Sequence, residues 1–124
     1  MSLWSNAIEQ RFRHPSHAGP LDAPGLLSGR ACANGLELSL DLAVEGGTIR
    51  QAAFRALGCP ATIAVADWLA EQLAGVPLDR ARDVNWPACE QALELPASRR
   101  SCLLLAQDAL EAAIGGFHGA RQSL

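Results

Sequence analysis

The sequence contains no lysine, and this absence removes a class of chemistry. All of the basic side chains among its 124 residues are arginines. Without a lysine amine, the chain can form no Schiff base with a carbonyl substrate and has no lysine nucleophile. Acidic residues outnumber basic ones, so that the formal net charge is −3. A concentrated cationic face for phosphate groups is therefore not expected, and we predict no nucleic-acid partner.

Long apolar stretches are also missing. No apolar run reaches the roughly 18 residues that a membrane-spanning helix needs. No basic segment followed by an apolar stretch opens the chain, so we expect no secretory signal. Together these features predict a cytoplasmic protein without a membrane partner. The length and the content of 49% hydrophobic residues predict one folded domain over residues 1–124.

Several catalytic motifs are absent as well. The sequence has no Gly-x-Ser-x-Gly, no phosphate-binding loop and no His-Glu-x-x-His, so nothing in it indicates a hydrolase or a kinase. It has four cysteines but no Cys-x-x-Cys. Disulfides are rare in the cytosol, which favours metal binding or sulfur chemistry for these thiols. Three histidines, His14, His17 and His118, are expected to be solvated.

A period of two over residues 35–44 is the clearest structural signal. Leucines alternate there with mostly polar residues, which indicates a strand with one buried face. The sequence Glu-Gly-Gly-Thr that follows predicts a hairpin turn. A second strand is expected over residues 49–56, with a less regular pattern that is consistent with a bulge, and a third, short one around residues 29–32. The prediction is a small, three-stranded antiparallel sheet.

Helical patterns surround this sheet. Residues 4–12 have apolar side chains at helical spacing. A second helix is predicted from Cys59 to a glycine cap at Gly75, with Asp67 and Glu71 on its solvent side. Because strands come before most of the helices, the fold class predicted is α+β.

Two further helices are predicted towards the end of the chain. Asn85 is a typical N-cap for a helix over residues 86–93. Ser98 is the expected N-cap of a last helix over residues 99–114, and Gly115 with the glycine after it is expected to stop that helix.

Cys59 stands where the strand pattern gives way to the helical one. It lies between Gly58 and Pro60, and proline is favoured at the first position of a helix. Cys59 is therefore predicted at or near the N-cap. There the positive end of the helix dipole lowers the pKa of a thiol and favours the thiolate, which is the form that binds metals or attacks sulfur.

The other cysteines lie in different surroundings. Cys32 is placed among small residues and glycines, which keep a thiol accessible, whereas Cys102 follows two arginines near a helix start, a setting that favours a thiolate. Cys89 lies inside a helix and is interpreted as core packing. Spacing by itself favours inert core thiols. Local context favours a reactive set of Cys32, Cys59 and Cys102.

Three phrases that contain these thiols resemble a known family. They are Gly-Arg-Ala-Cys-Ala-Asn, Phe-Arg-Ala-Leu-Gly-Cys-Pro-Ala-Thr-Ile-Ala and Leu-Glu-Leu-Pro-Ala-Ser-Arg-Arg-Ser-Cys-Leu-Leu-Leu. In this order they resemble the U-type iron–sulfur scaffold family, which includes IscU and the N-terminal domain of NifU. The resemblance covers about residues 4–114. It implies an α+β fold with a small antiparallel sheet packed against helices. It also implies a scaffold that is not an enzyme.

The resemblance further implies a function and its residues. Such scaffolds take sulfur from a cysteine desulfurase, assemble a transient [2Fe-2S] cluster and supply apo iron–sulfur proteins. The cluster ligands implied are Cys32, Cys59 and Cys102. Because Cys102 lies near the arginines at the start of the last helix, we predict it to be the sulfur acceptor. Zinc is found at the same site in some members. Asn34 and Ser101 stand at the family's auxiliary-ligand positions, where an aspartate and a histidine are usual, and both are weaker donors.

These departures leave three hypotheses open. The first is a divergent scaffold, and the second is a zinc-bound module that accepts sulfur or modulates a desulfurase. The third is a binding protein that keeps the fold while its metal site has decayed. The segment Leu-Pro-Ala-Ser-Arg at residues 95–99 departs from the family's Leu-Pro-Pro-Val-Lys. Recognition by the family's Hsp70-type chaperone is therefore doubtful.

Overall fold

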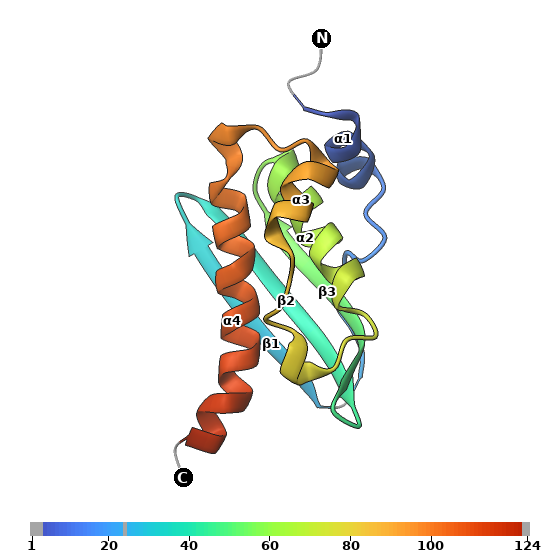
Figure 1. Ribbon diagram of the computed structural model, residues 1–124, viewed down its shortest axis with the longest axis vertical. Coiled ribbons are helices and arrows are strands. Elements are labelled where there is room, and N and C mark those ends of the chain that lie inside the picture. Colours follow the sequence, from blue (N-terminus) through green and yellow to red (C-terminus); the bar gives the residue numbers. More distant parts are fainter. Residues whose placement is uncertain (1–3, 24, 123–124) are drawn as a thin grey trace.

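The computed structural model describes residues 4–23 and 25–122, with side chains up to residue 115. A short helix comes first and three strands follow, before the remaining helices, which confirms the α+β class (Figure 1). In chain order the elements are α1 (Asn6–Arg13), β1 (Leu26–Ala33), β2 (Leu36–Glu45), β3 (Thr48–Leu57), α2 (Pro60–Leu73), η1 (Leu78–Arg80), α3 (Trp86–Leu93), η2 (Ala97–Arg99) and α4 (Ser101–Gln122). No helix in these described ranges is long and apolar enough to span a bilayer.

The strands form an antiparallel sheet with the order β1-β2-β3, as predicted. The predicted turn between β2 and β3 contains Gly46 and Gly47, whose φ angles of 62° and 78° are those that a tight hairpin turn requires. The predicted irregularity is a bulge. Val44 pairs with Ile49 while Ala43 pairs with Gln51, so the residue between these two β3 positions is left over. Strand β1 is longer than predicted.

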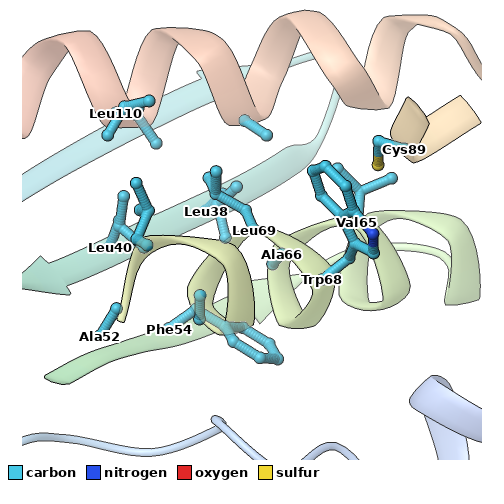
Figure 2. Packing of buried hydrophobic residues seen from close by; sticks show 14 of the residues in the cluster. Leu38, Leu40, Ala52, Phe54, Val65, Ala66, Trp68, Leu69, Cys89 and Leu110 are labelled. Carbon is cyan, nitrogen blue, oxygen red and sulfur yellow. The ribbon is translucent and has the colours of Figure 1, made fainter. Parts of the chain in front are cut away.

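Helices α2 and α4 lie against the same face of this sheet (Figure 1). Alternate residues of β2 point towards them, and Leu38 and Leu40 have at most 1% of their surface exposed. Their side chains meet those of Leu69 from α2 and Leu110 from α4 in the hydrophobic core (Figure 2). Burial of these leucines is the main force that holds the two helices on the sheet.

Helix α4 approaches β1 most closely at Gly29. A Cβ atom at this position would lie 2.2 Å from the backbone nitrogen of Ala113 and 2.3 Å from the backbone oxygen of Ala109. No side chain fits in that space. The glycine therefore sets the distance between the strand that contains Cys32 and the helix that contains Cys102.

The predicted limits of the last helix were wrong at both ends. Ser98 lies inside the 3-10 helix η2, and α4 begins at Ser101. At the other end, α4 continues through Gly115 and the next glycine to Gln122. A glycine costs a helix only about 1 kcal/mol relative to alanine. Packing of the buried Ala113 and Ile114 just before it keeps the helix in place.

We predict opposite effects for two glycine-to-alanine variants of this region. Gly29→Ala should lower the free energy of unfolding by about 1–3 kcal/mol, because its methyl group collides with the α4 backbone. Gly115→Ala should raise it by about 0.5–1 kcal/mol, since the position is helical and no atom lies within 4 Å of the added Cβ. Urea unfolding measures both values. A destabilised Gly115→Ala would contradict the continuous helix.

Asp67 was predicted on the solvent side of its helix, and this was wrong. Only 1% of its surface is exposed. Its carboxylate accepts hydrogen bonds from Nη1 of Arg11 at 2.9 Å and from the backbone N–H of His17 at 2.9 Å. The segment before β1 covers this side of α2, because residues 17–19 also pair with Phe54 at the outer edge of β3.

His17 was predicted to be solvated, and this was also wrong. Only 26% of its side chain is exposed, and Nδ1 lies 3.4 Å from Oδ1 of Asp67. Among the described side chains, this buried Nδ1 has no hydrogen-bond partner. The N-terminal segment is therefore an ordered layer on α2.

Replacing the buried carboxylate of Asp67 tests how much its contacts with the N-terminal segment stabilise the fold. We expect Asp67→Asn to lower the free energy of unfolding by about 1–3 kcal/mol, because it removes a charged acceptor that two buried donors share. The control is Glu71→Gln, which alters the exposed carboxylate that Arg11 also contacts at 3.2 Å. Exposed pairs of this kind contribute about 0–1 kcal/mol. Equal decreases in the free energy of unfolding of the two variants would show that the buried carboxylate stabilises the fold no more than the exposed one.

Candidate thiol site

Cys59 lies at the N-cap of α2, as the sequence predicts. Its φ and ψ angles of −77° and 166° are extended, and Pro60 follows at the first helical position. Gly58 permits a close approach here, because a Cβ on it would lie 2.9 Å from Cδ2 of Leu36 and 3.0 Å from Oγ1 of Thr62. The glycine therefore places the cysteine where β2, β3 and α2 meet.

The pKa of Cys59 is lowered, in agreement with its predicted thiolate character. Burial acts to raise this pKa, but hydrogen bonding from the Thr62 side chain outweighs it together with the backbone N–H groups of Thr62 and Ala61. These N–H groups face the sulfur without completing a formal side-chain cap. Because the residue is also partly exposed, its surroundings favour an accessible, nucleophilic thiol.

Cys102 lies in the first turn of α4, as predicted, but its predicted thiolate character was wrong. Its exposed fraction is 1%. Burial raises the pKa of Cys102, and the nearby Cys59 raises it further, while hydrogen bonding to Thr62 and the charge of Arg99 lower it only in part. Cys102 is thus the protonated partner of the pair.

The two arginines upstream of Cys102 are directed elsewhere. Arg99 lies over the ring of Trp4, with its Cζ 5.3 Å from the ring centroid. Arg100 forms an ion pair with Glu90 at 2.5 Å. Proximity in sequence therefore overstated how strongly these charges act on the Cys102 sulfur.

Thr62 joins the two cysteines, and sequence reasoning missed it. Its hydroxyl lies 3.4 Å from the sulfur of Cys59 and 3.5 Å from the sulfur of Cys102. The residue is 1% exposed. A threonine three positions after a capping cysteine was the available signal, because such a side chain lies on the first turn of the same helix.

Cys32 stays apart from this pair. It is exposed in β1 and pairs with Glu37 of β2. Glu37 precedes Leu38, which faces the helices, so Cys32 belongs to the opposite face of the sheet. Among the side chains of residues 4–23 and 25–115, no three from histidine, cysteine, aspartate or glutamate lie close enough together to hold a metal ion.

Asn34 and Ser101 lie at the surface near these thiols. Asn34 and Gly35 form the turn between β1 and β2, with positive φ angles of 52° and 79°. Asparagine and glycine are the usual pair in such turns, so Asn34 has a clear conformational role. Ser101 is the exposed first residue of α4.

The remaining candidates have simpler surroundings. Cys89 is fully buried in the core, which confirms its interpretation as packing (Figure 2), and burial raises its pKa to about 12. His14 is exposed at the end of α1, as predicted. The side chain of His118 lies outside the described residues.

Two exposed leucines flank the thiol pair in the sequence. Leu57 precedes Cys59 by two residues and is 67% exposed, and Leu104 follows Cys102 by two residues and is 60% exposed. Apolar side chains therefore accompany the reactive thiol at the surface.

The pH dependence of the alkylation rate should distinguish Cys59, Cys102 and Cys89. We expect the reaction of Cys59 with iodoacetamide to reach its plateau rate at a lower pH than that of an ordinary thiol, whose pKa is about 8.5. Cys102 should require a higher pH, and Cys89 should stay unmodified in the native protein. Peptide mass spectrometry measures each rate. A Cys102 that reacts at the same pH as Cys59 would contradict the two opposite pKa shifts.

Comparisons with known proteins agree with this fold. The family described as NifU-like N terminal domain matches residues 3–123. The iron–sulfur cluster assembly scaffold protein IscU of Escherichia coli is 28% identical over 126 residues, which cover 97% of this chain and 98% of that protein. Iron sulfur cluster assembly protein 1, mitochondrial, of Candida glabrata is 28% identical over 98% of this chain, which spans only 60% of that relative.

A solved structure extends the likeness to three dimensions. The N-terminal part of a NifU-like protein from Brucella abortus superposes with a TM-score of 0.71 at 16% identity, over 93% of this chain and 94% of that one. At this identity the match supports the fold. Together with the match to the family over nearly the full chain, it leads to one conclusion: this chain belongs to the NifU-like N-terminal domain family.

Proposed function

We propose that this protein is an iron–sulfur cluster assembly scaffold. It accepts sulfur from a cysteine desulfurase, holds a transient [2Fe-2S] cluster on Cys32, Cys59 and Cys102, and passes the cluster to apo iron–sulfur proteins. The observation that carries the proposal is the pairing of Cys59 and Cys102 around Thr62, with the pKa of Cys59 lowered. Iron–sulfur clusters are held by cysteine thiolates, so the donor chemistry fits.

The cluster is the cargo that the protein carries. The three cysteines proposed to hold it differ in protonation, exposure and position. Cys59 has a lowered pKa and a partly exposed sulfur, whereas Cys102 must first lose a proton. Cys32 is on the other face of the sheet. A shift of one residue in strand register moves every side chain to the opposite face, so Cys32 joins the others when the end of the β1–β2 hairpin leaves its present register.

Sulfur transfer is a displacement at a persulfide. A scaffold thiolate attacks the outer sulfur of the desulfurase persulfide, a new S–S bond forms on the scaffold, and the old S–S bond breaks. The desulfurase cysteine leaves as a thiolate, so no oxidant is consumed. Our proposed acceptor is Cys102, and its buried sulfur must be uncovered for this step. Because Cys59 is more exposed, mapping the persulfide by mass spectrometry distinguishes the two thiols.

The proposal describes a carrier without catalytic turnover, formed by a single domain over residues 1–124. We place it in the cytoplasm. An Hsp70-type chaperone is not included among its partners. Leu95 of the corresponding segment is 7% exposed, and Arg99 is engaged with Trp4, so the segment does not present an extended apolar chain.

A zinc-bound module that modulates a desulfurase is the second candidate. It is favoured by Asn34 and Ser101, which offer an amide and a hydroxyl where the family has stronger ligands. Thiolate sites accept zinc as well as iron–sulfur clusters. A protein that binds neither metal would fit the third hypothesis, a decayed site.

Anaerobic reconstitution tests these functions. With ferrous iron, cysteine, a cysteine desulfurase and a thiol reductant that reduces the persulfide sulfur to sulfide, we expect visible charge-transfer absorption and equal amounts of iron and sulfide on the protein. Cys59→Ser should lose this cluster, because a hydroxyl does not replace the thiolate. Cys89→Ala should keep it, since that thiol is in the core. Stoichiometric zinc without a cluster would support the second candidate, and full cluster occupancy in Cys59→Ser would refute the ligand assignment.

A further inference from the structure

Thr62 has an unusual set of partners for a buried hydroxyl. In a helix, a threonine hydroxyl commonly bonds to a backbone carbonyl three or four residues earlier. Within the described residues, this one has two sulfur atoms as its side-chain hydrogen-bond partners, at 3.4 and 3.5 Å. Buried hydroxyl groups need a partner, and the sulfur of a protonated thiol such as Cys102 is a weak one. A contribution to the stability of the fold therefore does not explain well why this hydroxyl lies between two sulfurs.

We propose that Thr62 is a positioning residue that holds Cys59 and Cys102 as a preformed two-thiol half-site. A divalent metal binds this half-site first, and Cys32 joins afterwards. The inference rests on the proposed function for the identity of the cargo, and it adds a residue and an order of binding to that function.

The geometry of α2 makes Thr62 suited to this role. Its side chain is β-branched and therefore has little rotamer freedom on a helix. Gly58 leaves room for its hydroxyl, since a Cβ at that glycine would lie only 3.0 Å from Oγ1 of Thr62. A hydroxyl can donate to one sulfur while it accepts from another. Thr62 can thus hold both sulfurs whichever of them keeps its proton.

The position of Cys32 explains why it binds the metal after Cys59 and Cys102. The sulfurs of Cys59 and Cys102 share one hydrogen-bond partner, whereas Cys32 is exposed on the opposite face of the sheet. Groups that are already held together bind a metal at a lower entropic cost than groups that must first move. The pair therefore binds before the third thiol.

Two variants separate positioning from packing. Thr62→Val keeps the shape of the side chain and removes the hydroxyl, whereas Thr62→Ser keeps the hydroxyl and removes a methyl group. Anaerobic titration with Co²⁺ reports thiolate binding through sulfur-to-cobalt charge-transfer absorption. Groups that support metal ligands typically contribute 10- to 100-fold in affinity. We expect Thr62→Val to bind Co²⁺ at least about tenfold more weakly with an unchanged midpoint of thermal unfolding, and Thr62→Ser to retain most of the affinity.

The order of binding is tested with cysteine variants. Cys32→Ser should still bind Co²⁺, more weakly and with less charge-transfer absorption, whereas Cys59→Ser and Cys102→Ser should lose the absorption. Cys89→Ala serves as the matched control and should bind as the unaltered protein does, because Cys89 is in the core.

Several outcomes would overturn the inference. They are an unaltered protein that binds no Co²⁺, an unchanged affinity in Thr62→Val, or a loss of affinity in both Thr62 variants that follows their loss of stability. Equal losses in Cys32→Ser and Cys59→Ser would overturn the order. If Co²⁺ binding depends on Thr62 but no cluster forms with a desulfurase, the half-site stands and the proposed scaffold function fails.

Discussion

Leu38, Leu40 and Leu42 alternate along the central strand and press one face of the sheet against α2 and α4. This contact fixes which face of β2 is turned towards the helices, because a shift of β2 by one residue would expose all three leucines to water. The other close approaches follow from it. Gly29 lies against the backbone of α4, and Gly58, just after β3, lies against the side chains of Leu36 and Thr62; a Cβ at either glycine would collide with these atoms. The sites of Cys59 and Cys102 are consequences of this packing.

Burial acts on the thiols in the same direction, and their hydrogen bonds distinguish them. Removal from water raises the pKa of a thiol. At Cys89 this effect is opposed only weakly, and the pKa rises to about 12. At Cys59 the start of α2 and the Thr62 hydroxyl more than compensate for it. Cys102 has the same hydroxyl but less compensation, so its pKa is raised. A helix start thus makes a thiol reactive only when its N–H groups reach the sulfur.

Features that depend on neighbours in sequence could be predicted. The alternation of β2, the hairpin turn and the Asn85 cap, whose side chain accepts from the N–H of Ala88 at 3.1 Å, all follow from local rules. Features that depend on what covers a residue could not. Asp67 has the sequence neighbours of a solvated residue, but an ordered segment from the N-terminus lies over it. The gap between Cys32 and the other thiols likewise depends on strand register, which no local pattern of residues states.

Within the part of the chain that the structure describes, strand β1 has a neighbour on one side only, since the sheet order places it beside β2 at the end of the series. The strand at the opposite edge of the sheet, β3, is hydrogen-bonded along its outer edge to residues 17–19. Loosening the end of β1 therefore breaks one ladder of hydrogen bonds, whereas moving β2 would break two. Cys32, which faces away from the thiol pair, is thus on a strand that is paired along one edge. The opposite outer strand, β3, is paired along both edges, with β2 and with residues 17–19.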